Sequence, residues 1–272
     1  MKITIADDFD LCKIAYSGQC FRVKELDKDT FRFVTKENTV EITDESYKGG
    51  RKKPDDETIL SVSCAKKEWD IWHDYFDLDT NYAGIRKSIP REDDFLRRAA
   101  ESGAGIRILK QDLFEMLISF IISQRKSIPA IKTSIERLVS LYGQDGFFPT
   151  PEALKDATSE ELASCGLGYR VPYIMSAVRR VYEHEVDLDA LGALSDEELV
   201  NELKSFAGVG DKVANCVALF GYHRCGLAPI DTWIARVIKE QYCGTNPFPR
   251  YGNVAGIMQQ YMFYYMSVIS RK

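Results

Sequence analysis

The chain has 272 residues, enough for one large domain or two modest ones with a substantial core. Hydrophobic residues make up 45% of it and charged residues 28%, which is typical of a soluble globular protein. The net charge of −5 argues against a surface that attracts polyanions everywhere, but it leaves room for a local basic patch. Three basic positions could build such a patch: Arg125-Lys126, Arg179-Arg180 and Arg236.

The cysteines and histidines give no sign of a metal centre. The seven cysteines form no CxxC pair, which excludes a zinc ribbon or an iron–sulfur cluster of the usual spacing and indicates reduced intracellular thiols. The three histidines are scattered along the chain. The first ten residues lack the apolar core of a signal peptide, so we expect a cytoplasmic protein without a targeting segment.

Two kinds of periodicity divide the chain. Residues 1–45 alternate apolar and polar positions in short runs separated by polar turns, which predicts an antiparallel sheet. Residues 46–57 are polar and predict a loop, and from about residue 88 the apolar spacing becomes helical. We therefore predict an α+β fold, with a β-rich domain over 1–100 and a mostly helical domain over 101–272.

One segment, 251–270, is uncharged over twenty residues. It contains Asn253, Gln259 and Gln260, whose polar groups a lone membrane-spanning helix would bury without partners at a cost. We expect a buried or groove-lining helix here, and no membrane contact.

The helical half contains one layout twice. Capping boxes at 158–161 and 195–198 each predict the start of a short helix, and each helix leads to a Gly-x-Gly turn, at 166–168 and 208–210. Helix, tight turn and helix make a hairpin, of which the second copy covers about 196–220. The alternative is a pair of ordinary helix-ending glycines, which we favour for the first copy taken alone.

Lys212 follows the second glycine turn directly. Such a turn exposes backbone N–H groups at the positive end of a helix, an arrangement that binds phosphate. The helix dipole and burial would help the Lys212 ammonium to lose its proton, and a neutral amine is a nucleophile. The local sequence leaves both roles open and favours the phosphate contact slightly.

Asp231 precedes the apolar run of a further predicted helix. A simple N-cap explains it. A carboxylate held at a helix N-terminus also stays ionised, so Asp231 could balance positive charge that develops on a sugar.

The run at 206–216, followed by Asp231, resembles the helix-hairpin-helix–Gly/Pro-Asp superfamily of DNA glycosylases, most closely its 8-oxoguanine DNA glycosylase branch. Matching features extend from residues 17–19 to Phe263. The resemblance implies a bifunctional DNA glycosylase/AP lyase of base excision repair. In it Lys212 attacks C1′ of the damaged nucleotide, expels the base and forms a Schiff base whose β-elimination nicks the strand. Asp231 would stabilise the sugar cation and help to orient the hairpin.

The resemblance also implies a pocket for a flipped base. The carbonyl of Gly18 would accept the hydrogen on N7 of 8-oxoguanine and repel the lone pair on N7 of guanine, a mismatch that costs about 1–3 kcal/mol. Gln259 would read the Watson–Crick edge, and Phe263, four residues on and on the same helix face, would stack on the base. Cys216, one helical turn after Lys212, would cover its other face. Without the resemblance, Gly18 is a turn residue, Phe263 a core residue and Cys216 an inert thiol.

Other residues are matched to contacts with the rest of the DNA. Tyr169 would fill the gap that the flipped base leaves, and Arg170 would contact the orphaned partner base. The hairpin residues Gly208, Gly210 and Val213 would bind backbone phosphates.

Three positions depart from the family pattern. Many relatives have an Asn-rich turn and a later arginine that grip the cytosine opposite the lesion, where this chain has Arg125 and Ala130. Losing one of two bidentate contacts weakens discrimination by about 1–3 kcal/mol, so we predict a relaxed preference for the opposite base. Trp233 replaces a histidine that contacts phosphate in some relatives, which puts that contact in doubt.

Two alternatives remain at this point. A sibling glycosylase for mismatched adenine or oxidised pyrimidines would use the same scaffold, but the adenine enzyme lacks the lysine, and many members of both branches carry a C-terminal four-cysteine cluster that is absent here. A non-enzymatic module could instead grip phosphates with both hairpins. We expect the 8-oxoguanine DNA glycosylase rather than either alternative. It would be a monomer that binds double-stranded DNA containing 8-oxoguanine and needs no cofactor.

Overall fold

The computed structural model describes residues 1–46 and 57–269, so the predicted loop at 46–57 lies almost wholly outside the described residues. The contacts divide the chain into two compact units. Unit 1 contains residues 1–33, 39–110 and 223–272, and unit 2 contains residues 34–38 and 111–222. A single boundary near residue 100 does not describe this grouping, since residues 223–272 belong to the same unit as the N-terminal residues. The division into folding domains at 1–100 and 101–272 stays a prediction.

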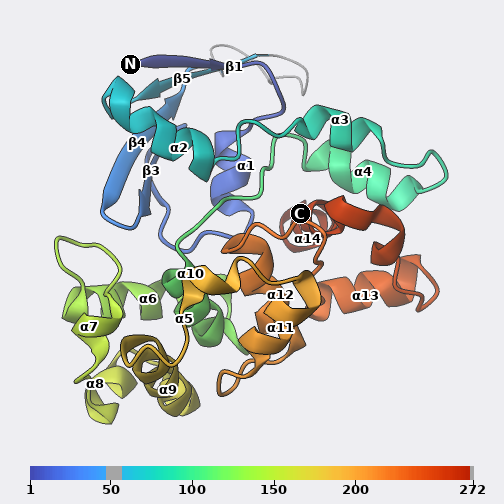
Figure 1. The fold of residues 1–272 in the computed structure, drawn as a ribbon. Helices are drawn as coiled ribbons and strands as arrows, with labels where there is room; N and C mark the ends of the chain where they lie inside the picture. The colour runs from blue at the N-terminus through green and yellow to red at the C-terminus, as the bar shows by residue number, and fades with distance from the viewer. Residues whose placement is uncertain (47–56, 270–272) are drawn as a thin grey trace. The chain divides into compact units, whose positions relative to one another are not determined.

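Unit 1 contains a five-stranded sheet of order β1-β5-β4-β3-β2, as the alternating pattern predicted (Figure 1). Its strands pair antiparallel at β1–β5, β4–β5 and β2–β3. The strands are β1 (Lys2–Ile5), β2 (Lys24–Asp27), β3 (Thr30–Thr35), β4 (Asn38–Asp44) and β5 (Thr58–Val62).

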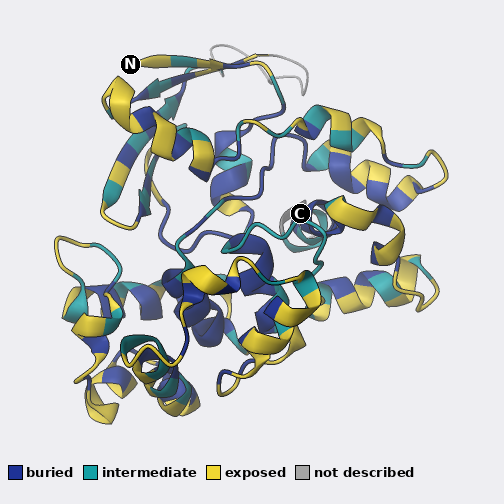
Figure 2. Ribbon diagram, viewed as in Figure 1, coloured by how far each residue is buried: buried dark blue, intermediate teal, exposed yellow. Residues whose placement is uncertain are grey.

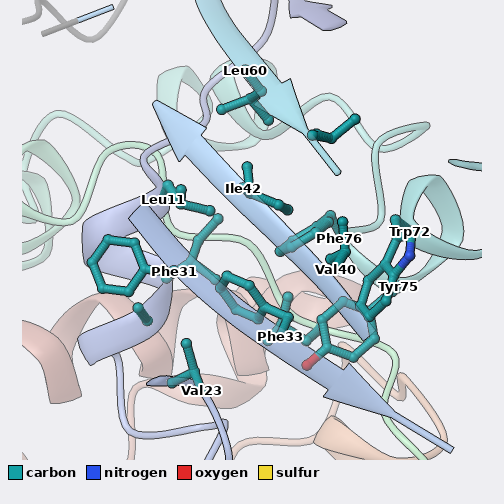
Figure 3. Packing of buried hydrophobic residues seen from close by; sticks show 14 of the residues in the cluster. Leu11, Val23, Phe31, Phe33, Val40, Ile42, Leu60, Trp72, Tyr75 and Phe76 are labelled. Carbon is teal, nitrogen blue, oxygen red and sulfur yellow. The ribbon is translucent and has the colours of Figure 1, made fainter. Parts of the chain in front are cut away.

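Alternation in the sheet places one set of side chains in a hydrophobic core. Phe31 and Phe33 on β3 are buried, as are Val40 and Ile42 on β4, because successive strand residues point to opposite faces. They pack with aromatic residues of helix α2 (Trp69–Tyr75), and Figure 3 shows Phe33 beside the rings of this helix.

In the described part of unit 1, six helices accompany the sheet. They are α1 (Leu11–Tyr16), α2, α3 (Tyr82–Lys87), α4 (Asp94–Ser102), α13 (Thr232–Gln241) and α14 (Ala255–Tyr264). Short 3-10 turns at 66–68 and 248–254 and a π-helical turn at 265–269 connect or extend them. The described part of the uncharged segment, 251–269, therefore forms several short elements, of which α14 is almost entirely buried, as expected. Within the described residues, no helix is long and apolar enough to cross a membrane.

Unit 2 is helical and is organised around α5 (Leu113–Ser123), which is buried along nearly its whole length (Figure 2). Its helices agree with the helical apolar spacing predicted from about residue 88 onward. The remaining helices are α6 (Ile128–Tyr142), α7 (Pro151–Leu154), α8 (Ser159–Ser164), α9 (Val171–Tyr182), α10 (Leu188–Leu191), α11 (Asp196–Lys204) and α12 (Asp211–Phe220). Both predicted capping boxes are confirmed, at the starts of α8 and α11. The fold is thus the α+β class predicted from the sequence.

Candidate active site

The hairpin of α11 and α12 places Lys212 in the first turn of α12. Gly208 has a φ of +77°, and a Cβ at this position would lie 2.3 Å from the ring of Tyr173 on α9. Both the left-handed backbone and the close ring require glycine here. Gly210 differs: its backbone is extended, and a Cβ there would meet no described atom within 4 Å.

The start of α12 is open for an anion. Gly210 is the N-cap and supplies no side-chain cap, so the first N–H groups of the ten-residue helix, including that of Val213, keep their hydrogen-bonding capacity at the positive helix end. The carboxylate of Asp211 forms an ion pair of 2.6 Å with Lys204 of α11. The hairpin has therefore the form of a phosphate-binding turn.

The ammonium of Lys212 lies against an aromatic ring rather than a carboxylate. Its Nζ is 5.2 Å from the ring centroid of Phe120 on α5, and Phe120 stacks on Phe220 at 5.6 Å. Among the residues that the structure describes, the Lys212 ammonium has no ion pair or hydrogen bond. Cys216 is buried one turn further along α12, on the same face as Lys212. The Lys212 side chain is therefore half-buried beside an aromatic ring, with no anionic partner among the described residues.

Asp231 is the N-cap of α13, as the sequence predicted, and lies in unit 1, whereas Lys212 lies in unit 2. Its Oδ1 accepts a hydrogen bond of 2.8 Å from the backbone N–H of Ile234. The carboxylate is half-buried, so the helix start holds a negative charge in a fixed orientation.

Unit 1 also contains three of the residues predicted to bind the flipped base, which are Gly18, Gln259 and Phe263. Gln259 and Phe263 lie on α14, and Gln259 is 4% exposed with an Oε1 atom that has no hydrogen-bond partner among the described residues. Phe263 is half-buried one turn later. Gly18 follows α1 with a φ of +81°, and Gln260 of α14 donates to the carbonyl of the preceding Ser17 at 2.7 Å. A buried, unpaired amide oxygen is costly unless a ligand completes it, which favours a binding role for Gln259.

The first glycine turn of unit 2 presents an exposed aromatic ring. Tyr169 is 50% exposed although its ring is large and apolar, and the guanidinium of Arg170 stacks over it at 4.3 Å. Arg170 itself is buried, and it donates to the carbonyls of Leu167 and Gln124. Its predicted contact with the orphaned base stays a prediction; in this structure its side chain supports Tyr169.

The turn between α5 and α6 carries the residues that depart from the family pattern. Arg125 is exposed with a φ of +51°, a left-handed conformation that is uncommon for an arginine, and Ala130 is exposed in the first turn of α6. Next to them, Lys126 donates to Ser134 and to the carbonyl of Gly166 at 2.5 and 2.6 Å. Burial, together with the charges of Arg170 and Arg137, holds the pKa of Lys126 below its ordinary value.

Three residues that contact the candidate site were not predicted from the sequence. Tyr173 and Phe120 occupy ordinary apolar helix positions, and nothing in their spacing marks them. Gln260 is a polar residue in an otherwise apolar run, which is a signal for a buried hydrogen bond that could have been used. Within the described part of the chain, no three His, Cys, Asp or Glu side chains are grouped to hold a metal ion.

Comparison with known proteins identifies the family of the chain. Residues 2–117 match the N-terminal domain of 8-oxoguanine DNA glycosylase, and residues 118–259 match the HhH-GPD superfamily of base excision DNA repair proteins. The chain belongs to the HhH-GPD superfamily, in its 8-oxoguanine DNA glycosylase branch. The predicted enzyme class, a DNA glycosylase with AP lyase activity, is thereby confirmed.

Individual members of this family are similar over most of the chain. A Methanothermobacter thermautotrophicus protein named "Probable N-glycosylase/DNA lyase" is 30% identical over 225 residues, 69% of this chain and 70% of its own length. The solved structure of MBOgg1 with a low-affinity DNA ligand is 34% identical, with a TM-score of 0.88, and covers 99% of this chain and 96% of its own. The Clostridium acetobutylicum 8-oxoguanine glycosylase/lyase, solved with double-stranded DNA containing cytosine opposite 8-oxoguanine, is 30% identical with a TM-score of 0.86, covering 99% and 98%.

Proposed function

We propose that the chain removes 8-oxoguanine from duplex DNA by base flipping and then nicks the strand at the resulting site. The observation that carries this proposal is Lys212 itself: a half-buried amine in the first turn of the hairpin's second helix, over Phe120 and without an anionic partner among the described residues. Two of the relatives above are named as a probable N-glycosylase/DNA lyase and an 8-oxoguanine glycosylase/lyase, which supports the same chemistry here.

The proposed reaction begins with the neutral amine of Lys212. Its nitrogen lone pair attacks C1′ as the N-glycosidic bond breaks, and the base leaves with the bonding electrons and takes up a proton. The carboxylate of Asp231 stabilises the positive charge that builds on the sugar. Ring opening gives a protonated Schiff base on Lys212. Loss of a proton from C2′ then expels the 3′ phosphate, which is the β-elimination that nicks the strand.

Recognition of the base is proposed to use the residues of unit 1. The Gly18 carbonyl accepts the N7 hydrogen that only the oxidised base carries, and Gln259 pairs its free Oε1 with the Watson–Crick edge of the flipped base. Phe263 stacks on one face of the base and Cys216 covers the other. The oxidised and normal bases differ at N7 by a hydrogen and a lone pair, so one carbonyl separates them.

The DNA strand is proposed to bind through backbone groups of the hairpin and through Tyr169. The uncapped N–H groups near Gly210 and Val213 meet a phosphate, and the exposed ring of Tyr169 fills the gap in the stack. Ala130 has only a methyl group and cannot donate hydrogen bonds to the base opposite the lesion, so excision is expected with little preference for cytosine. The chain is expected to act as a monomer and without a cofactor.

Borohydride trapping tests the chemistry. A duplex containing 8-oxoguanine should give a covalent adduct with the native chain, because borohydride reduces the Schiff base to a stable amine. Lys212→Gln should give no adduct. Lys204→Gln is the matched control, since Lys204 lies in the same hairpin but only forms an exposed ion pair with Asp211.

Two results would contradict the proposal. If Lys212→Gln still traps, another amine is the nucleophile. If the native chain traps on oxidised pyrimidines or excises mismatched adenine but leaves 8-oxoguanine untouched, a sibling specificity is correct instead.

A further inference from the structure

The turn that carries Gly18 is held by side chains on both flanks. On one flank, the Ser17 hydroxyl donates to the carbonyl of Ile14 at 2.7 Å, and the Ser17 carbonyl accepts from Gln260 at 2.7 Å. On the other flank, the Gln19 amide donates to the Ser17 hydroxyl at 2.9 Å. Ser17 is fully buried, so water cannot replace these bonds.

Gln19 is hydrogen-bonded in turn to a buried segment of unit 1. Its amide donates to the carbonyl of Arg107 at 2.8 Å, and its Oε1 accepts from the N–H of Leu109 at 2.8 Å. Arg107 is completely buried, and its guanidinium donates to backbone carbonyls at Phe76 and Asp77. The Gln19 side therefore has an anchor that does not involve α14.

Gln260 donates a hydrogen bond from α14 to this turn, to the carbonyl of Ser17. It is 2% exposed and directly follows Gln259, so the bond ties the Gly18 turn to the helix that carries Gln259 and Phe263. Glycine at a φ of +81° has no Cβ to limit rotation of its neighbouring peptide groups. The direction of the Gly18 carbonyl thus depends on anchors outside the glycine.

We propose that Gln260 is a positioning residue for lesion recognition: its bond to the Ser17 carbonyl sets the Gly18 carbonyl in register with Gln259 and Phe263. This inference rests on the proposed function. A hydrogen bond weakens steeply when distance or angle changes, and a displacement of about 1 Å at a recognition group is enough to cost a large part of the rate. Gln260 acts through Ser17 and does not touch the base.

The experiment compares two activities of one protein. Gln260→Met keeps the length of the side chain but removes the donor. Excision of 8-oxoguanine should fall about tenfold, whereas cleavage of a preformed abasic site, which has no base to read, should stay within about twofold. Tyr261→Phe is the matched control: the next residue on α14 is also fully buried, and its hydroxyl has no hydrogen-bond partner among the described residues. It should leave both activities unchanged.

Each other outcome has a distinct meaning. Equal excision by Gln260→Met and the native chain would overturn the inference and leave the proposed function intact. A parallel loss of both activities would show a structural role for Gln260 and would also overturn it. A native chain that cleaves abasic sites but excises no 8-oxoguanine would instead defeat the proposed function, whatever Gln260 does.

Discussion

The two glycine turns of unit 2 share a sequence layout but differ in structure. Both follow a helix opened by a capping box, and both begin with a glycine at a φ of +77°, Gly166 and Gly208. At the first turn the second glycine, Gly168, is also left-handed, and a 3-10 turn lifts Tyr169 to the surface. At the second turn Gly210 is extended and begins a regular helix. One layout therefore gives an exposed ring in one place and an uncapped helix start in the other.

The side chains around the turns explain this difference. The first turn is held by cations, since Lys126 donates to the Gly166 carbonyl and Arg170 stacks on Tyr169. The second is held by packing, since the ring of Tyr173 fills the space beside Gly208. Tyr173 also packs edge-to-face on Tyr169 at 6.2 Å, so the two turns share a contact. The lesson is that neighbouring residues, more than the glycines, decide what a glycine turn presents.

The largest effect is expected where packing and backbone both demand glycine. Gly208→Ala places a methyl group into the Tyr173 ring at a left-handed position, so it should lower the free energy of unfolding by about 3 kcal/mol. Gly168→Ala has a similar backbone strain but open space, and should cost about 1 kcal/mol. Thermal unfolding of both variants measures the difference. Equal costs would show that the Tyr173 contact does not distinguish the two turns.

The exposed ring of the first turn should matter for catalysis and not for stability. Tyr169→Ala should reduce excision of 8-oxoguanine from duplex DNA by about 30-fold, because the stack then lacks the residue that fills the gap, and stacking on an aromatic ring is worth about 1–3 kcal/mol. Single-turnover excision measures this. Leu141→Ala removes an equally exposed apolar side chain of α6 and should change nothing. A similar loss in both variants would assign Tyr169 no particular role.

The turn beside Tyr169 should set the choice of opposite base. Ala130→Arg should create a preference for cytosine of about tenfold, since one bidentate contact to a base is worth about 1–3 kcal/mol. Excision measured opposite each of the four bases tests this together with the relaxed preference of the native chain. A native chain that already demands cytosine would show that Arg125 or another residue supplies the contact.

The smallest effect concerns the charge that holds the first turn. The pKa of Lys126 is lowered in the folded chain, so the folded state releases this proton at a lower pH than the unfolded state, whose lysine keeps its ordinary value near 10.5. Stability should therefore rise with pH through this residue as pH approaches 10.5 from below. Relative to Lys126→Met, the native chain should gain stability in chemical denaturation over that window. If the difference in the free energy of unfolding between the two proteins were the same at every pH, the surroundings of Lys126 would not lower its pKa.

Local sequence was sufficient for the elements whose causes are local. The capping boxes, the N-cap role of Asp231, the alternating strands and the buried α14 follow from neighbouring residues, and the structure confirms each of them. The family resemblance supplied the candidate site, which local physics alone left open between catalysis and phosphate binding at Lys212. The ring under its amine comes from Phe120, about ninety residues away, and no pattern around Lys212 could indicate it.

The sequence by itself thus determined the fold class and the hairpin, because periodicity, capping and glycine turns act over a few residues. Only the tertiary structure decided which glycine cannot be replaced, which aromatic ring is exposed and which side-chain amide oxygen has no hydrogen-bond partner among the described residues. Those properties depend on Tyr173, Arg170 and the surroundings of Gln259, which are brought into place by packing between distant segments. The Ser17–Gln260 hydrogen bond, joining residues 243 positions apart, is the clearest example.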